Sequence, residues 1–145
     1  MKFLIFACLV AAVLALALPA VFFFNERFVN PGVIRELKTE PDRERAQKVM
    51  LLTLPSARTI PVNYLREGDR VYAGADGRWW QELVGGGFRV EMLLRGEKLE
   101  GVARAVRDDP DYTRAIFARL RPSALPGFGT LIEIRLDSEV PSTDE

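Results

Sequence analysis

Apolar and polar side chains alternate in short runs from residue 49 onward, and turn-forming residues separate the runs. The clearest run covers residues 88–95, where every second side chain is apolar and Leu93 is the one exception. Alternation with a period of two indicates strands that keep one face in a core and the other in water. The chain is therefore expected to build its folded part from antiparallel strands.

Five further runs have strand character, at residues 50–54, 58–66, 70–75, 98–107 and 127–136. Turn signals at residues 67–69 and 96–97 join neighbouring runs as hairpins. Three small residues, Gly101, Ala103 and Ala105, share one face of their strand. Small inward residues suit the crowded interior of a barrel.

One helix is expected between the last two strands. The stretch Asp108-Asp109-Pro110 forms its amino-terminal cap, with proline in the first turn, and Arg121-Pro122 ends it. Its apolar stripe consists of Tyr112, Ile116, Phe117 and Leu120. About six short antiparallel strands with a helix before the last are enough to close a small barrel. The predicted fold class is therefore mainly β, with an α+β order of elements.

Residues 3–24 contain no charged side chain and would span a bilayer as a helix of about 33 Å. A cleaved signal peptide is the alternative, because Ala15 and Ala17 form a small-x-small pattern. The apolar run continues to Phe24, which favours a retained transmembrane anchor. Positive residues after the span favour a cytoplasmic domain, although Lys2 before it is also typical of outward-facing anchors. We expect a single-pass protein of the cell membrane, with its domain on the cytoplasmic side.

The chain divides into four parts on this interpretation. They are an anchor (1–24), a charged helical connector near the membrane surface (25–48), a barrel domain (49–137) and a disordered tail (138–145). Asn30-Pro31 marks a helix start in the connector, and Pro41 interrupts that helix. A domain of this size can fold alone, and a homodimer would add buried surface.

Composition excludes several classes of function. Lysine plus arginine equals aspartate plus glutamate, 20 each, so no basic face for nucleic acid is expected. The chain has no histidine, which excludes Ser-His-Asp and Cys-His catalysis. Its single cysteine, Cys8, lies in the apolar leader, so neither an internal disulfide nor a Cys/His metal site is expected. No catalytic residue can be named on these grounds.

Trp79 and Trp80 stand side by side in the stretch GRWWQELVGGG. In a strand they would point to opposite faces of the sheet, so that one face could not bury both. A short helical turn that joins two strands would instead let each indole face its own surroundings. The glycines at 85–87 would then free the chain to re-enter the sheet. The indoles could form a wall for a flat, isoalloxazine-like ring. Alternatively, one plugs the end of the barrel and the other covers the domain or meets the membrane interface.

Residues 52–106, from LTLPSARTIPVNY to GVARAV, resemble the deazaflavin-dependent nitroreductase and quinone reductase family, and the resemblance covers about residues 30–120. The strand motif of the family is matched by Arg58, Pro61, Val62 and Tyr64, its aromatic motif by residues 79–83, and further positions by Arg89-Val90 and Ala103-Arg104. The resemblance implies a split β-barrel related to the flavin-binding pyridoxamine phosphate oxidase fold.

The resemblance also implies an activity. It predicts a membrane-anchored oxidoreductase that transfers a hydride from a reduced deazaflavin to a quinone-like acceptor in the bilayer, with flavin mononucleotide as an alternative cofactor. The candidate cofactor-binding residues are Ser56, Arg58, Tyr64, Arg78, Trp79, Trp80 and Gln81. The arginines could pair with a phosphate or carboxylate, although such residues also serve as solvated strand-end charges. Ser56 and Tyr64 have structural alternatives too, in the turn and in the core.

Departures from the family pattern fall on the loops that touch its cofactor. The turn at residues 55–57 keeps only Ser56 of a glycine, arginine and serine set, and the loop at residues 75–78 is short. Gln81 and Glu82 replace a histidine and an asparagine, and a carboxylate is a poor neighbour for an anionic tail. The alternative function is therefore a non-catalytic membrane-anchored barrel that binds a lipid, another hydrophobic ligand or a partner protein.

Overall fold

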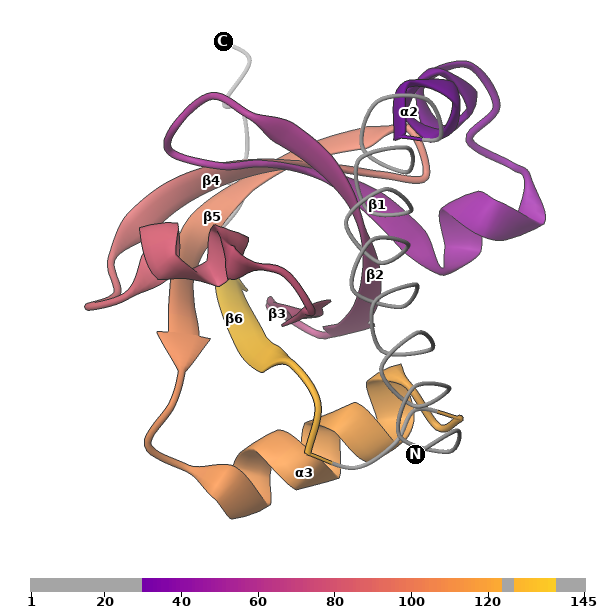
Figure 1. Cartoon of the computed structure of the whole chain (residues 1–145). Coiled ribbons are helices and arrows are strands. Elements are labelled where there is room, and N and C mark those ends of the chain that lie inside the picture. The colour runs from indigo at the N-terminus through magenta and orange to yellow at the C-terminus, as the bar shows by residue number, and fades with distance from the viewer. Residues whose placement is uncertain (1–29, 124–126, 138–145) are drawn as a thin grey trace, which may run out of the picture.

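A computed structural model describes residues 30–123 and 127–137 (Figure 1). In this part of the chain, antiparallel strands close into a barrel in the order β1-β2-β3-β6-β5-β4. The strands are β1 (Val49–Thr53), β2 (Thr59–Glu67), β3 (Arg70–Ala75), β4 (Phe88–Leu94), β5 (Glu97–Val106) and β6 (Thr130–Leu136). The helical elements are α2 (Asn30–Thr39), η2 (Glu44–Gln47), η3 (Arg78–Leu83) and α3 (Pro110–Leu120). The predicted set of six antiparallel strands, with a helix before the last, is confirmed.

Two long-range strand pairs close the barrel. β1 pairs with β4, so that Leu52 lies opposite Met92, and β3 pairs with β6, so that Ala73 lies opposite Ile132. The remaining pairs join strands that are consecutive in the sheet and the chain, except that α3 intervenes between β5 and β6. Figure 1 shows α3 on the side of the barrel away from α2.

The interior of the barrel is filled by its own side chains. The largest of these, including Met50, Leu52, Leu83 and Ile132, are fully buried. The small residues of β5 serve close packing, as the sequence predicted, because a Cβ at Gly101 would clash with the backbone of β6. A ligand of cofactor size must therefore bind outside this core.

Leu93 breaks the alternation of β4 for a physical reason. Its side chain points away from the barrel interior and packs against an outer cluster that contains Leu37, Ala46 and Leu51. Leu37 belongs to α2 and Ala46 to η2, and both are buried. The segment that was expected to be a charged connector thus packs its apolar side onto β1 and β4.

Two predicted segments lie outside the described residues: the anchor at residues 1–24 and the tail at residues 138–145. Between residues 30 and 137, leaving out 124–126, no helix is both long and apolar enough to cross a bilayer.

A charged network on the outer face of the barrel attaches α3. Glu133 of β6 is only 5% exposed and accepts hydrogen bonds from Tyr112 Oη (2.5 Å), Arg104 Nε (3.0 Å) and Arg70 Nη1 (3.2 Å). The Tyr112 hydroxyl also lies 2.9 Å from that of Tyr72. Burial by itself raises the pKa of Glu133, but the bonds from Tyr112 and Arg104 and the nearby arginine charges outweigh it and hold the pKa below its usual value. The network joins β3, β5, β6 and α3 through one carboxylate.

Replacing Glu133 with glutamine should lower the free energy of unfolding at pH 7 by about 1–3 kcal/mol, because two arginines lose a buried anionic partner. Since the folded pKa of Glu133 is lowered, its stabilisation is present above the unfolded pKa and is lost as the pH falls through the folded value. The difference between wild type and Glu133→Gln should therefore shrink below about pH 4.3. Chemical denaturation of the full chain at several pH values measures both effects.

Glu97→Gln is the matched control, because Glu97 forms an ion pair with Arg66 in which both side chains are well exposed. That substitution should change the free energy of unfolding by no more than about 0.5 kcal/mol. Equal effects of the two substitutions would contradict the role assigned to Glu133.

Candidate functional site

The adjacent tryptophans lie on η3, a 3-10 helix rather than a strand. This confirms the prediction of a short helical turn that joins two strands. Gly85, Gly86 and Gly87 follow it with φ values of 96°, 77° and 80°, which side-chain-bearing residues rarely adopt. The chain can therefore reverse quickly into β4, and the two indoles face different parts of the surface.

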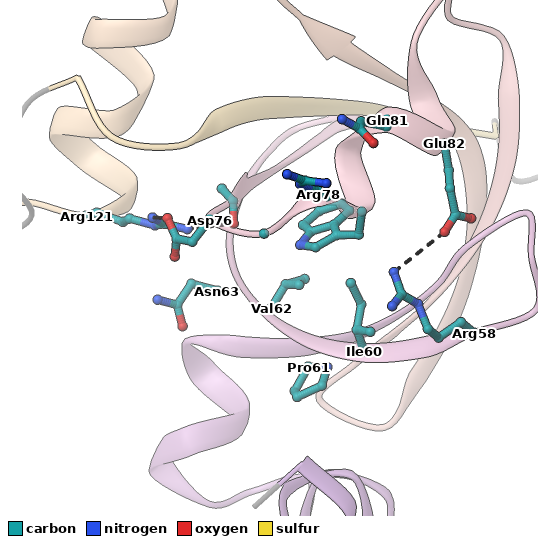
Figure 2. Close-up of a pocket in the computed structure, with 13 residues that line it drawn as sticks. Arg58, Ile60, Pro61, Val62, Asn63, Asp76, Arg78, Gln81, Glu82 and Arg121 are labelled. Atoms are coloured by element: carbon teal, nitrogen blue, oxygen red, sulfur yellow. Dashed lines mark hydrogen bonds and ion pairs between the residues drawn. The ribbon is translucent and has the colours of Figure 1, made fainter. Parts of the chain in front are cut away.

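A cleft of about 800 Å³ lies at one end of the barrel, between β2, the β3–η3 loop, η3 and the end of α3 (Figure 2). Its lining residues are Arg58, Ile60, Pro61, Val62, Asn63, Gly74, Asp76, Gly77, Arg78, Trp79, Gln81, Glu82 and Arg121. The volume falls within the usual range for small-molecule and cofactor sites. We refer to this feature as the cleft.

The cleft carries three arginines and two carboxylates, which leaves one net positive charge. Arg58 Nη2 lies 3.6 Å from Glu82 Oε1 at one end, and Arg121 Nη1 lies 2.6 Å from Asp76 Oδ1 at the other. Arg78 lies between these two pairs in Figure 2, and it forms no ion pair with any residue that the structure describes. Arg78 is thus the cation of the cleft that remains available to an anionic ligand.

Glu82, the carboxylate that departs from the family pattern, is directed toward the β1–β2 turn. Besides its pairing with Arg58, it accepts a hydrogen bond from the backbone N–H of Ser56 at 3.3 Å. The short turn at residues 55–57 is therefore tied to η3. The repulsion that Glu82 would exert on an anion is partly neutralised by Arg58.

Four of the seven predicted cofactor-binding residues line the cleft together: Arg58, Arg78, Trp79 and Gln81. Arg58 directly precedes β2 and the other three belong to η3, and the hairpin of β2 and β3 separates them in sequence. The structure therefore brings a tryptophan, an amide and two guanidinium groups to one surface.

The other three predicted residues do not line the cleft. Ser56 is exposed on the turn beside it. The Tyr64 hydroxyl donates a hydrogen bond to the carbonyl oxygen of Ala46 at 3.2 Å, and burial raises its pKa. The ring of Trp80 packs against the core and lies under the Arg107 guanidinium, 5.2 Å from its centroid. Ser56 thus lies in the turn, and Tyr64 and Trp80 pack against the core of the domain. These positions agree with the structural alternatives to cofactor binding.

Sequence reasoning missed Arg121, whose only signal was its place in the Arg-Pro pair that ends α3. Its side chain is 13% exposed, and its guanidinium lies over the Phe117 ring, 5.5 Å from the centroid. Nη2 donates to the carbonyl oxygen of Gly74 at 2.6 Å, and Nε is buried without a hydrogen-bond partner among the described residues. Arg121 therefore joins the end of α3 to β3 at the wall of the cleft.

No metal centre accompanies these groups: across the described ranges, Asp and Glu side chains form no cluster that could hold a metal ion. Comparison of the chain with protein-family models and with curated proteins found no match in either case.

Gly74→Ala should disturb the attachment of Arg121, because a Cβ at position 74 would clash with the guanidinium. We expect a loss of about 1–3 kcal/mol in the free energy of unfolding, as for other substitutions that overfill a packed site. Gly32→Ala in α2 is the control, since its Cβ would meet nothing within 4 Å. It should be neutral or stabilising by up to about 1 kcal/mol. Urea denaturation of both variants makes the comparison, and a neutral Gly74→Ala would show that the Arg121 contact contributes little.

Proposed function

We propose that the cleft binds a flat, anionic cofactor of the deazaflavin type. On this proposal the protein is a membrane-anchored split-barrel oxidoreductase that passes a hydride to a quinone-like acceptor. The observation that carries the proposal is the convergence of Trp79, Arg58, Arg78 and Gln81 on one cleft outside a filled barrel.

The chemistry of the cleft fits such a cofactor. Its volume of about 800 Å³ suits a tricyclic ring with part of a tail. Trp79 offers an aromatic surface for the ring, and Ile60, Pro61 and Val62 of β2 supply apolar contacts. Arg78 has no ion-pair partner within the described part of the chain and would pair with a phosphate or carboxylate of the ligand.

A reduced deazaflavin, when bound, supplies the hydride. The residues of this chain bind it, orient its ring and keep water from the reacting face, and none of these tasks needs a histidine. Flavin mononucleotide combines a similar ring with a phosphate and is the alternative cofactor. A helix at residues 3–24 would hold the domain at the membrane, where a lipophilic acceptor is concentrated.

A non-catalytic barrel is the second candidate function. It is favoured by the pairing of both carboxylates of the cleft with arginines and by the filled interior, which leaves a ligand only the surface. On this alternative the cleft binds a hydrophobic ligand or a partner protein without turnover. Saturable binding without oxidation of a reduced cofactor would favour it.

Titration of the full chain with a deazaflavin and with flavin mononucleotide, followed by cofactor fluorescence, tests the proposal. Trp79→Leu removes the aromatic surface and should weaken binding about twofold to tenfold, since aromatic stacking contributes about 0.5–1.5 kcal/mol. Trp80→Leu is the matched control, because Trp80 faces Arg107 rather than the cleft. It should bind the cofactor as wild type does.

Activity is measured separately, as oxidation of the reduced cofactor by a short-chain quinone. Failure of the folded wild type to bind either cofactor would contradict the proposal. If Trp80→Leu weakens cofactor binding as much as Trp79→Leu does, the cofactor ring does not stack on Trp79 in the cleft.

A further inference from the structure

The two ion pairs of the cleft are arranged in opposite ways. At one end the arginine is covered and the carboxylate is exposed, with side-chain exposures of 13% for Arg121 and 70% for Asp76. At the other end Arg58 is the more exposed partner, at 50%, and Glu82 the more covered one, at 29%. Figure 2 shows the pairs on opposite sides of Arg78. The more exposed partner is easier to displace from each pair. It is the anion Asp76 at the Arg121 end and the cation Arg58 at the other end.

Arg121 is held in place independently of Asp76. Gly74 accepts a hydrogen bond from Nη2, and its lack of a side chain lets the guanidinium lie close against β3. The guanidinium also lies over the ring of Phe117. The cation would thus keep its position if Asp76 moved away, and a fixed guanidinium at the wall of the cleft is suited to an oxyanion.

Asp76 is bound less firmly. It lies on the loop between β3 and η3, and its contact with Arg121 is its one ion pair among the residues that the structure describes. An exposed carboxylate gains little from such a pair, because it is well solvated when the pair opens. A covered arginine, in contrast, loses more when it is left without an anion. Asp76 should therefore leave when another oxyanion can take its place.

We propose that the Arg121 end of the cleft is an oxyanion-binding subsite, in which Asp76 occupies the position of the ligand oxyanion until the ligand displaces it. Asn63, which Figure 2 places at this end, offers an amide that could donate to the same oxyanion. This inference rests on the proposed function for the identity of the whole ligand, and it adds that the ligand carries a carboxylate or phosphate at the end remote from Arg58. The oxyanion belongs either to the cofactor tail or to the acceptor.

Asp76→Asn provides the decisive test, because it removes the competing charge and keeps the size of the side chain. Three probes are titrated into the full chain by calorimetry: benzoate, its neutral analogue benzamide, and inorganic phosphate. Asp76→Asn should bind benzoate or phosphate about twofold to fivefold more tightly than wild type, which corresponds to the loss of one exposed ion pair. Affinity for benzamide should not change.

Arg121→Gln should abolish the binding of the same anion, whereas Arg119→Gln should bind it as wild type does. Arg119 is a matched control because it lies on α3 and forms an ion pair with Glu67, outside the cleft. Thermal unfolding shows whether each variant is folded. If Arg121→Gln does not fold, the anion affinities of Asp76→Asn and wild type alone decide whether the subsite exists.

The pattern of affinities separates the sources of the oxyanion. Tightening for phosphate alone points to the cofactor tail, and tightening for benzoate alone points to a carboxylate of the acceptor. Equal anion affinities in wild type and Asp76→Asn, or undetectable binding in both, would overturn the subsite. If the protein binds deazaflavin but Asp76→Asn does not change the affinity for the anions, the subsite is overturned and the proposed function stands. If Asp76→Asn tightens anion binding but no cofactor binds, the subsite stands and the proposed function is overturned.

Discussion

Closure of the barrel is the constraint on which the rest of this structure depends. The pairs β1–β4 and β3–β6 complete the hydrogen-bonded ring and enclose an interior that large apolar side chains fill. A filled interior leaves no room for a ligand of cofactor size, so such a ligand would have to bind on the outer surface or at the ends of the barrel. The cleft meets this condition because it is built where β2 and the β3–η3 loop reach the end of the barrel.

Attachment of α3 completes the cleft from one side. Polar contacts hold the helix along its length: the network around Glu133 near its start, the ion pair of Arg119 with Glu67 of β2, and the bond from Arg121 to Gly74 at its end. Between them, Ile116 is buried against Tyr72, Val106 and Leu131. The helix is therefore fixed at both ends and along its middle, which places Arg121 at the wall of the cleft.

The charged side chains of the cleft form two ion pairs, one at each end. Each carboxylate has an arginine, Arg78 lies between the pairs, and the exposed partner is of opposite sign at the two ends. On the proposed function, this arrangement would suit a ligand whose anionic group lies at the Arg121 end of the cleft. It also accounts for Glu82, which stabilises the turn at Ser56 while Arg58 offsets its charge.

The sequence by itself determined the strands, the turns and the capped helix, because these depend on side-chain alternation and local chemistry. The period of two placed Val90, Met92 and Leu94 in the core, and Asp109 caps α3 through the N–H of Tyr112 as its position predicted. The helical turn at Trp79 and Trp80 was also foreseeable from the two adjacent indoles, and the glycines that follow let the chain return to the sheet. Only the tertiary structure decided which tryptophan faces the cleft, because neighbours distant in sequence determine this. The tertiary structure also decided that Leu93 packs in one cluster with Leu37, and that Arg121 lies beside Gly74 and Asp76. Strand pairing and helix docking bring these residues together, and no local sequence pattern connects them.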